Sequence, residues 1–382
     1  KVTGEAQYPG DINMPNQAYM KILFAGRPHA KILEIDTSKA EALDGVIAVF
    51  TAKDVPVNEY GLQIPDQPVL CDDVVRFVGD QVAFVVAETA KIATRARDLI
   101  EVRYEDLPLV LDPREAMKKE SPLVHPKRDD TNICVHNRIR KGDVEKGFAE
   151  ADVIVEGEYQ TPVQEHAYLQ PEAGLAYLDE EGRVTVLVGG QWTHEDQEQI
   201  AHSLDISEDQ VRVIYPAIGG AFGGREDMSV QIVLALAAQK LKRPVKTIWS
   251  RRESIVGHAK RHPMTFRAKW GATKDGKLTA AEIEVIADAG AYMYTTNKVL
   301  GTSTITSAGA YAIPNIKSDL YGVYTNNVPG GAFRGFGAPQ ALFMAEMQME
   351  KLAAKLEIDP VELRRINAIK EGDTLAVGTP TP

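Results

Sequence analysis

Gly219-Gly220-Ala221-Phe222-Gly223-Gly224-Arg225-Glu226 is the stretch from which the organisation of this sequence is best understood. It follows a β-branched run, Val211–Tyr215, and precedes an apolar run, Met228–Leu241, whose length favours a buried helix. Glycines allow positive φ and let a backbone approach a ligand closely. A helix that follows directly aims free N–H groups and the positive end of its dipole at the same point. The stretch therefore predicts either an anion-binding loop or a tight strand-to-helix turn without a ligand.

A second loop of the same kind is Ala332-Phe333-Arg334-Gly335-Phe336-Gly337-Ala338-Pro339-Gln340. It follows a strand-like run, Leu320–Tyr324, and precedes a predicted helix over Ala341–Leu356. Arg334 would add a positive charge and a fork of N–H donors. Two such loops favour an anionic group held between them over two unrelated turns.

Neither loop matches the common phosphate-binding patterns. The P-loop pattern G-x-x-x-x-G-K-[ST] is absent, the first loop lacks the G-x-G opening of a dinucleotide site, and the second has Gln340 where the third glycine belongs. Phe222 and Phe336 lie inside the glycine runs, where aromatic rings can stack on a flat organic group. A nucleotide-binding module is therefore disfavoured.

The bulk composition excludes further classes of function. The chain has 382 residues, of which 44% are hydrophobic and 25% charged, as in ordinary globular proteins of two or three domains. A net charge of −11 argues against nucleic acid as a main partner, and no apolar run approaches the roughly 20 residues of a membrane span. Two cysteines, Cys71 and Cys134, are too few for an iron–sulfur cluster and fit a reducing, cytoplasmic compartment. Because the chain starts at Lys1, we expect it to be processed or truncated.

The patterning predicts an α+β fold in which residues 1–117 form a small domain, 118–143 a linker, and 144–382 a larger α/β region. Strands are predicted at Ile32–Ile35, Val46–Phe50, Val82–Val86, Ile100–Tyr104, Val153–Tyr159, Val184–Val188 and Val211–Tyr215. Helices beyond those already named are predicted at Thr89–Leu99, His194–Leu204 and Pro360–Ala368. The linker prediction rests on a run of proline, aspartate, asparagine and basic residues without periodicity.

The two loops resemble the molybdopterin-binding signatures of the xanthine dehydrogenase and aldehyde oxidase family of molybdenum hydroxylases. So do Gly189-Gly190-Gln191-Trp192-Thr193 and the stretch QEHAYLQPE at 164–172. VTGEAQY at 2–8 and VVRFVGDQVA at 74–83 resemble the a/b hammerhead domain that precedes the cofactor domain in this family. The resemblance covers nearly the whole chain. It implies an a/b hammerhead domain followed by a first molybdopterin-binding domain of mixed sheets and helices.

The resemblance also implies a role for each matching residue. Gln191 would donate a hydrogen bond to an oxygen on the molybdenum, and Arg334 would lie beside the cofactor. Phe336 would form one face of the substrate slot, and Glu226 would hydrogen-bond a heterocyclic substrate. The alternative for Glu226 is a carboxylate stabilised by a helix N-terminus. The backbone of the first loop would contact the cofactor, which is molybdopterin, expected in a dinucleotide form, through Gly220, Ala221, Phe222 and Gly223. Molybdenum would be held by pterin sulfurs, so no metal ligands from the protein are expected.

Two departures from the family pattern limit what this chain does alone. The family's general-base glutamate lies in a second cofactor domain, and this sequence ends before that domain would begin. We expect that glutamate on another chain, and the alternative is that this sequence is a fragment. Thr302 stands where purine-oxidising members carry an arginine, which places xanthine itself in doubt.

The resulting prediction is the catalytic subunit of a multi-component hydroxylase. It would hydroxylate an N-heteroaromatic substrate of purine or nicotinate type with water as oxygen source. Electrons would pass to an iron–sulfur subunit and a flavin (FAD) subunit. An aldehyde-oxidising member of the same family is the alternative, and a non-catalytic molybdopterin-binding scaffold is the alternative from another class.

Several residues are assigned no role in the chemistry. His258 and His262, four residues apart among basic side chains, predict a solvated surface on one helix face rather than a metal site. His166 and His194 are interpreted as packed or capping histidines, and Cys134 as an unreactive thiol within the linker.

Overall fold

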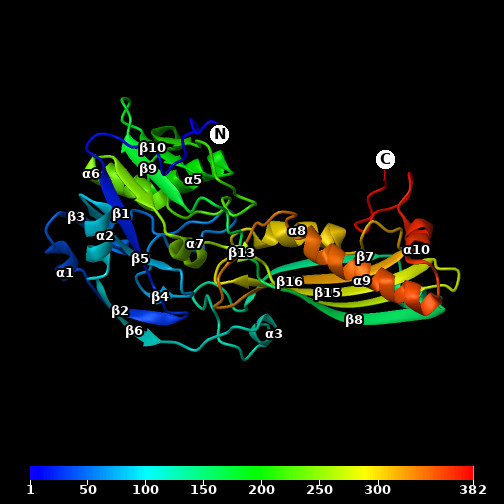
Figure 1. Ribbon diagram of the computed structural model, residues 1–382. Coiled ribbons are helices and arrows are strands. Elements are labelled where there is room, and N and C mark those ends of the chain that lie inside the picture. Colours follow the sequence, from blue (N-terminus) through cyan, green and yellow to red (C-terminus); the bar gives the residue numbers. More distant parts are fainter. Residues whose placement is uncertain (382) are drawn as a thin grey trace.

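Two large β-sheets organise the chain in a computed structural model that describes residues 1–381. They form the two lobes of Figure 1, one carrying the N-terminal half and the other an elongated sheet covered by a long helix. No helix of the described residues is long and apolar enough to cross a membrane. The mixture of sheets and helices confirms the predicted α+β class.

The first lobe is built on a seven-stranded sheet of order β11-β10-β9-β12-β1-β5-β3. Its strands are β1 (Ala18–Phe24), β3 (Val46–Phe50), β5 (Gln81–Ala87), β9 (Ala173–Leu178), β10 (Val184–Val188), β11 (Val211–Ile214) and β12 (Val245–Ile248). A smaller sheet has the order β4-β2-β6, with β2 (Ala30–Asp36), β4 (Val74–Val75) and β6 (Glu101–Asp106). The lobe's helices are α1 (Ser38–Glu41), η1 (Ala52–Asp54), α2 (Ala90–Arg97), α5 (Thr193–Leu204), η2 (Glu208–Gln210), α6 (Gln231–Leu241) and α7 (Arg251–Gly257).

The large sheet joins segments that the sequence assigned to different domains. β1 pairs in parallel with β12, with Ala18 opposite Val245, so strands from residues 1–117 and from 144–382 share one sheet. α6 packs on β9 and β10 and is buried along most of its length because it is apolar on all sides. The lobe's core therefore depends on both segments together.

The second lobe is a five-stranded sheet of order β7-β16-β15-β14-β8. Its strands are β7 (Ile133–Lys141), β8 (Val153–Thr161), β14 (Met264–Ala272), β15 (Leu278–Gly290) and β16 (Asn315–Tyr324), and β13 (Lys260–Arg261) pairs separately with β17 (Gly330–Gly331). α9 (Ala338–Leu356) lies on β8 and β14, with α8 (Thr296–Thr306) and α10 (Pro360–Asn367) beside it. α3 (Pro113–Ala116) and α4 (Val144–Ala149) contact β15 and β16 instead. Trp270 and Phe266 are fully buried beneath α9 in this lobe's core.

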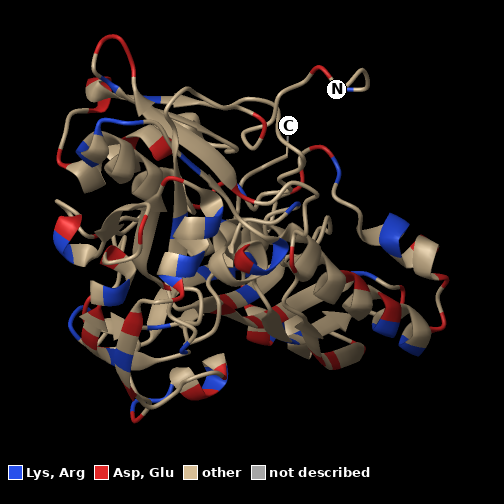
Figure 2. Cartoon of the chain, turned by 60° about the vertical axis from the view of Figure 1, so that its left-hand side comes forward, with Lys and Arg blue, Asp and Glu red and all other residues tan. Residues whose placement is uncertain are grey.

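Helix caps account for several helix starts. The Thr89 side chain accepts a hydrogen bond from Ile92 N at the start of α2, and Asp359 accepts from Val361 N and Glu362 N before Pro360 at the start of α10. Figure 2 shows acidic and basic residues intermixed on both lobes. Some form cross-strand pairs on the five-stranded sheet, such as Lys317 Nζ to Glu282 Oε1 at 2.6 Å.

The linker prediction is wrong in its second half. Residues 133–141 form β7, which pairs with β16 at the edge of the five-stranded sheet. Cys134 lies in this strand with its pKa raised by burial, so it is not a linker thiol. The strand was missed because an edge strand with one solvated face has few apolar residues to reveal it.

Candidate functional site: a cavity between two glycine loops

The two glycine loops meet at a cavity of about 470 Å³ between the lobes. Its lining residues are Gln191, Trp192, Phe222, Gly223, Glu226, Phe333, Arg334, Gly335 and Phe336. The loops touch directly, because Arg334 N donates to Phe222 O at 2.8 Å. Gly220 and Ala221 belong to the first loop but do not line the cavity. Segments more than 100 residues apart in sequence thus build one site.

The first loop presents unpaired backbone donors. The N–H groups of Gly220, Ala221 and Phe222 have no hydrogen-bond partner within residues 1–381. Gly220 and Phe222 have positive φ, 106° and 54°, so successive N–H groups converge as in an anion-binding nest. Gly223 has φ 98°, and a Cβ there would lie 2.8 Å from Ala332 C and O. Free donors in a cradle that admits no larger residue fit an oxygen-rich group such as molybdopterin.

The helix after this loop differs from the prediction. α6 begins at Gln231 rather than Met228, and the Gln231 side chain accepts from Ser229 N and Val230 N. The helix satisfies these amides itself, so its N-terminus offers fewer free donors than expected. Arg225 is also buried, donating to Gly220 O at 2.9 Å, and it holds the loop's shape from within.

Gln191 has a fixed amide orientation. Its Oε1 accepts from Gly223 N at 3.0 Å and from Arg225 N at 3.3 Å, so its Nε2 must be the end that faces the cavity. Nε2 lies 3.5 Å from Glu226 Oε1, at the limit of hydrogen bonding. The donor is therefore available to a bound group.

Glu226 is the carboxyl group among the cavity-lining residues. Its Oε2 is buried without a partner. Burial raises the pKa of the side chain to about 7; the positive charge of Lys298 opposes this rise, and the negative charge of Glu195 adds to it. A carboxyl group with such a pKa exists in both forms near neutrality, so it can donate or accept a hydrogen bond. The structure places it beside a substrate-sized space rather than at a helix N-terminus.

The second loop supplies the opposite wall. Phe336 has φ 51° between Gly335 and Gly337, and a Cβ at Gly337 would lie 2.3 Å from Val299 O, which explains the glycine there. Arg334 is exposed, and its guanidinium has no ion-pair or hydrogen-bond partner among residues 1–381. Phe336 thus has a strained backbone conformation between two glycines, and Arg334 is free to contact a ligand.

His166 connects both loops from behind the cavity. Its Nε2 lies 2.7 Å from Ala332 O, its ring stacks on Phe333 with centroids 4.3 Å apart, and a Cβ at Gly224 would meet the ring at 2.8 Å. Burial lowers the pKa of His166 to about 4, so the ring is neutral and its proton resides on Nε2, facing the carbonyl. The sequence interpretation of a packed histidine holds, but its contacts with both loops were not foreseen.

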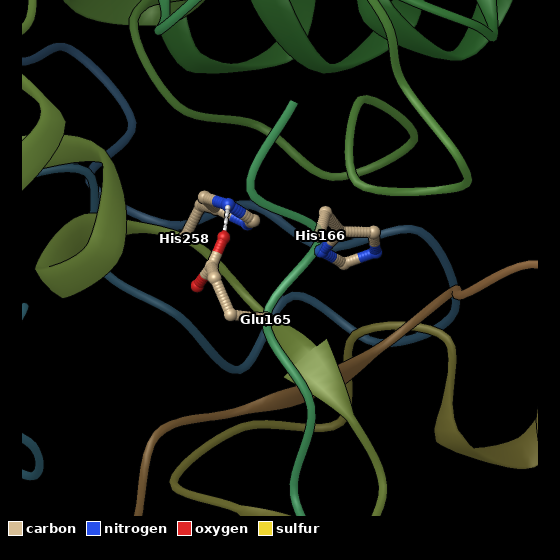
Figure 3. A group of neighbouring side chains, drawn as sticks. All are labelled: Glu165, His166 and His258. Atoms are coloured by element: carbon tan, nitrogen blue, oxygen red, sulfur yellow. Dashed lines mark hydrogen bonds and ion pairs between the residues drawn. The ribbon is translucent and has the colours of Figure 1, made fainter. Parts of the chain in front are cut away.

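The prediction that His258 and His262 lie on a solvated helix face is wrong. His258 caps the end of α7 and His262 follows β13, so they do not share a helix face, and both are buried. His258 Nε2 lies 3.1 Å from Glu165 Oε1, beside His166 (Figure 3). The other Glu165 oxygen pairs with Lys260 Nζ at 2.6 Å. Basic residues were mistaken for a surface because their acidic partner lies 93 positions away in sequence.

The cluster of Glu165, His166 and His258 has the spacing of a metal site, with ligand atoms within 4.8 Å of one another. However, each Nε2 is already engaged, with Ala332 O or with Glu165, so the rings could offer only their Nδ1 atoms, which are buried without a partner. Lys260 also neutralises the carboxylate, and a divalent cation beside this ammonium would be repelled. We interpret the cluster as the support of the loops.

Lys298 is a site residue that the sequence reasoning missed. It lies in the first turn of α8, and its Nζ stands 4.3 Å from the centroid of the Trp192 ring, which lines the cavity. Thr302 lies one turn later, with its Oγ1 donating to Lys298 O. An isolated lysine in a polar helix gives no sequence signal of such a position.

Two family models match the chain. The molybdopterin cofactor-binding domain matches residues 124–368, and the aldehyde oxidase and xanthine dehydrogenase a/b hammerhead domain matches residues 3–108. The chain is 42% identical to a probable xanthine dehydrogenase subunit of Bacillus subtilis over 98% of its own length and 50% of that protein. It is 41% identical to the nicotinate dehydrogenase large molybdopterin subunit of Eubacterium barkeri, over 99% of this chain and 88% of that subunit.

Solved structures give the same result. The aldehyde oxidoreductase from Desulfovibrio gigas superimposes with a TM-score of 0.94 at 33% identity, over 99% of this chain and 43% of that one. Quinoline 2-oxidoreductase from Pseudomonas putida 86 superimposes with a TM-score of 0.91 at 26% identity, over all of this chain and 50% of that one. The chain thus spans half or less of several of the proteins it matches.

Proposed function

Because this chain belongs to the aldehyde oxidase and xanthine dehydrogenase family of molybdopterin-binding proteins, we propose that it is the cofactor-binding catalytic part of a molybdenum hydroxylase acting on an N-heteroaromatic substrate. The substrate is of purine or nicotinate type. The observation that carries the proposal is the convergence of Gln191, Glu226 and Phe336 on one cavity bounded by the two cofactor loops. A scaffold protein would have no need of a carboxyl group and an aromatic wall around a substrate-sized space.

The chain's own residues bind and orient. The free N–H groups at 220–222 and the Gln191 amide hold the oxygens of the cofactor, and Arg334 balances its negative charge. The bound molybdopterin group supplies the redox chemistry that inserts oxygen derived from water and accepts two electrons. Phe336 keeps a flat ring in the plane in which its reacting carbon meets the cofactor.

Glu226 favours a heterocycle over an aldehyde. Its carboxyl group, with a pKa near 7, can donate to a bare ring nitrogen or accept from a ring N–H. A simple aldehyde has only a carbonyl oxygen, which can accept from the protonated carboxyl group but offers no donor to the ionised one. The aldehyde-oxidising alternative is supported by the structural likeness to the Desulfovibrio gigas enzyme.

Other polypeptide segments complete the enzyme in this proposal. The cavity lining offers Glu226 as its carboxylate, and in this proposal that group faces the substrate and the general-base glutamate is supplied by a second cofactor domain outside residues 1–382, expected on another chain. Electrons leave through iron–sulfur and FAD groups on partner subunits, and the pterin is a dinucleotide form. The relatives that are longer than this chain leave room for such segments.

The test is purification of the native complex followed by elemental analysis and anaerobic turnover with an artificial electron acceptor. The proposal requires molybdenum bound to the complex and oxidation of a pyridine or purine in preference to acetaldehyde. Preference for the aldehyde would replace the substrate assignment with the alternative. A complex that retains molybdenum but turns over neither class would support the scaffold.

A further inference from the structure

Lys298 holds a half-buried ammonium group against the wall of the cavity. The Trp192 ring lies beneath it at 4.3 Å and fixes its position through a cation–π contact. Trp192 itself lines the cavity next to Gln191. The ammonium is therefore placed at the edge of the substrate space rather than in bulk solvent.

This ammonium has no partner in the chain. Within residues 1–381, no carboxylate lies within 4.0 Å of Lys298 Nζ and no oxygen accepts a hydrogen bond from it. Other sheltered lysines are paired, since Lys260 contacts Glu165 and Lys246 donates to the carbonyl oxygens of Gly10 and Ile12. A sheltered cation without an acceptor is typical of a group that a ligand completes.

The surrounding charges indicate what that ligand carries. Glu226 faces the same cavity, and the Lys298 ammonium is the group that opposes the rise in its pKa. Thr302, one turn later on the same face of α8, is uncharged, so Lys298 supplies the cation of this face. The cavity thus offers a hydrogen-bonding carboxyl group for a ring nitrogen and, beside it, an ammonium for an anionic substituent.

Resting on the proposed function, we propose that Lys298 is a specificity-determining residue that binds a carboxylate substituent on the N-heteroaromatic substrate. Arg334, the unpaired cation among the cavity-lining residues, belongs to the second cofactor loop, and in the proposed function it serves the cofactor. The substrate class is therefore an anionic pyridine-type ring rather than a neutral heterocycle. The ion pair forms on binding and needs no rearrangement of either loop.

The experiment compares pyridine-3-carboxylate with pyridine-3-carboxamide, which share the ring and differ in charge, on the purified native complex. Lys298→Met should raise KM for the carboxylate by about tenfold or more, as expected for loss of a sheltered charge pair, with kcat little changed. KM for the carboxamide should change by less than about twofold, because a neutral substituent forms no ion pair. Lys298→Arg should restore most of the preference. Lys351→Met is the matched control. Lys351 lies on α9, away from the cavity, and its Nζ stands 4.9 Å from the centroid of the Tyr159 ring.

A second readout does not depend on turnover. Binding of pyridine-3-carboxylate without an electron acceptor is followed by tryptophan fluorescence, with Trp192→Phe as the blank. Equal effects of Lys298→Met on both ligands, or no effect on either, would overturn the role of Lys298 even if heterocycles are oxidised. Lys298-dependent binding without oxidation of any heterocycle would refute the proposed function and leave the carboxylate site standing. Absence of both turnover and binding would overturn both.

Discussion

Replacement of His166 by phenylalanine tests whether the two cofactor loops are held in register from behind. The phenyl ring keeps an aromatic face against Phe333, and it removes the Nε2–H that faces Ala332 O together with the unpartnered Nδ1. His166 is 7% exposed and Ala332 is fully buried, so water cannot replace the lost donor. The variant therefore isolates one buried hydrogen bond.

The expected cost follows from that burial. A buried carbonyl left without its donor costs about 1–3 kcal/mol, equivalent to a roughly 5- to 150-fold shift between seated and displaced loops. The free energy of unfolding should fall by a similar amount. Because Ala332 lies two residues from Arg334, the second loop should lose its position first. The molybdenum content of the purified complex should then decrease, while secondary structure is retained.

The assay measures molybdenum per chain and denaturant unfolding for wild type and three variants. His166→Gln, whose amide can approach the Nε2 position, should recover part of the loss. His202→Phe makes the same exchange at an exposed position of α5 and should leave molybdenum content unchanged. If His166→Phe binds molybdenum and unfolds as wild type does, the hydrogen bond to Ala332 O does not position the loop and the reasoning fails.

Three further predictions concern the first loop and its surroundings. Gly223→Ala should abolish cofactor binding, because the residue has φ 98° and its Cβ would lie 2.8 Å from Ala332 C and O. Gly301→Ala is the control: the glycine lies in α8 with open space around it, so the substitution should be neutral or stabilising. Molybdenum analysis of both variants checks this prediction. Glu226→Gln should lower kcat/KM for N-heterocycles by roughly 10- to 100-fold and leave kcat/KM for acetaldehyde nearly unchanged. An equal loss of kcat/KM for both substrate classes would exclude contact of Glu226 with the ring nitrogen. Asp196 is buried and its pKa is raised from 3.8 to about 7, so the folded chain keeps a proton that the unfolded chain releases, and this contribution to stability is lost as pH rises from about 4 to about 7. In urea unfolding, the decrease in the free energy of unfolding over that window should be smaller for Asp196→Asn than for wild type by about 4 kcal/mol, and an identical decrease would count against this role.

Local patterns in the sequence determined many, though fewer than half, of the elements of the fold. β3 and β10 were predicted with their observed bounds, and α5, α9 and α10 within a few residues. These elements have clear period-two or helical patterning and recognisable caps, which depend only on neighbouring residues. β14 and β15 were not predicted although both are long, because charged residues interrupt both sequences and the buried side of β15 is built largely of alanine rather than β-branched residues.

The pairing of distant segments was decided by the tertiary structure. The predicted boundary near residue 117 does not separate the sheets, since β1 and β12 join residues from both sides in one core. Such pairing depends on complementary surfaces of segments far apart in sequence, so no short stretch of sequence reveals it. The same is true of His258, whose partner Glu165 comes from a different part of the chain and makes a basic run into a buried cluster.

For the candidate site, the sequence by itself identified the two glycine loops and the residues Gln191, Glu226, Arg334 and Phe336, because glycines next to aromatic and charged groups leave a readable motif. The tertiary structure alone decided that these residues face one cavity and that the N–H groups at 220–222 remain free. It also brought His166 behind the loops and Lys298 beside Trp192. The physical reason is that a motif reports what the backbone must do locally, whereas the charge and shape of a cavity are set by side chains that meet only after folding.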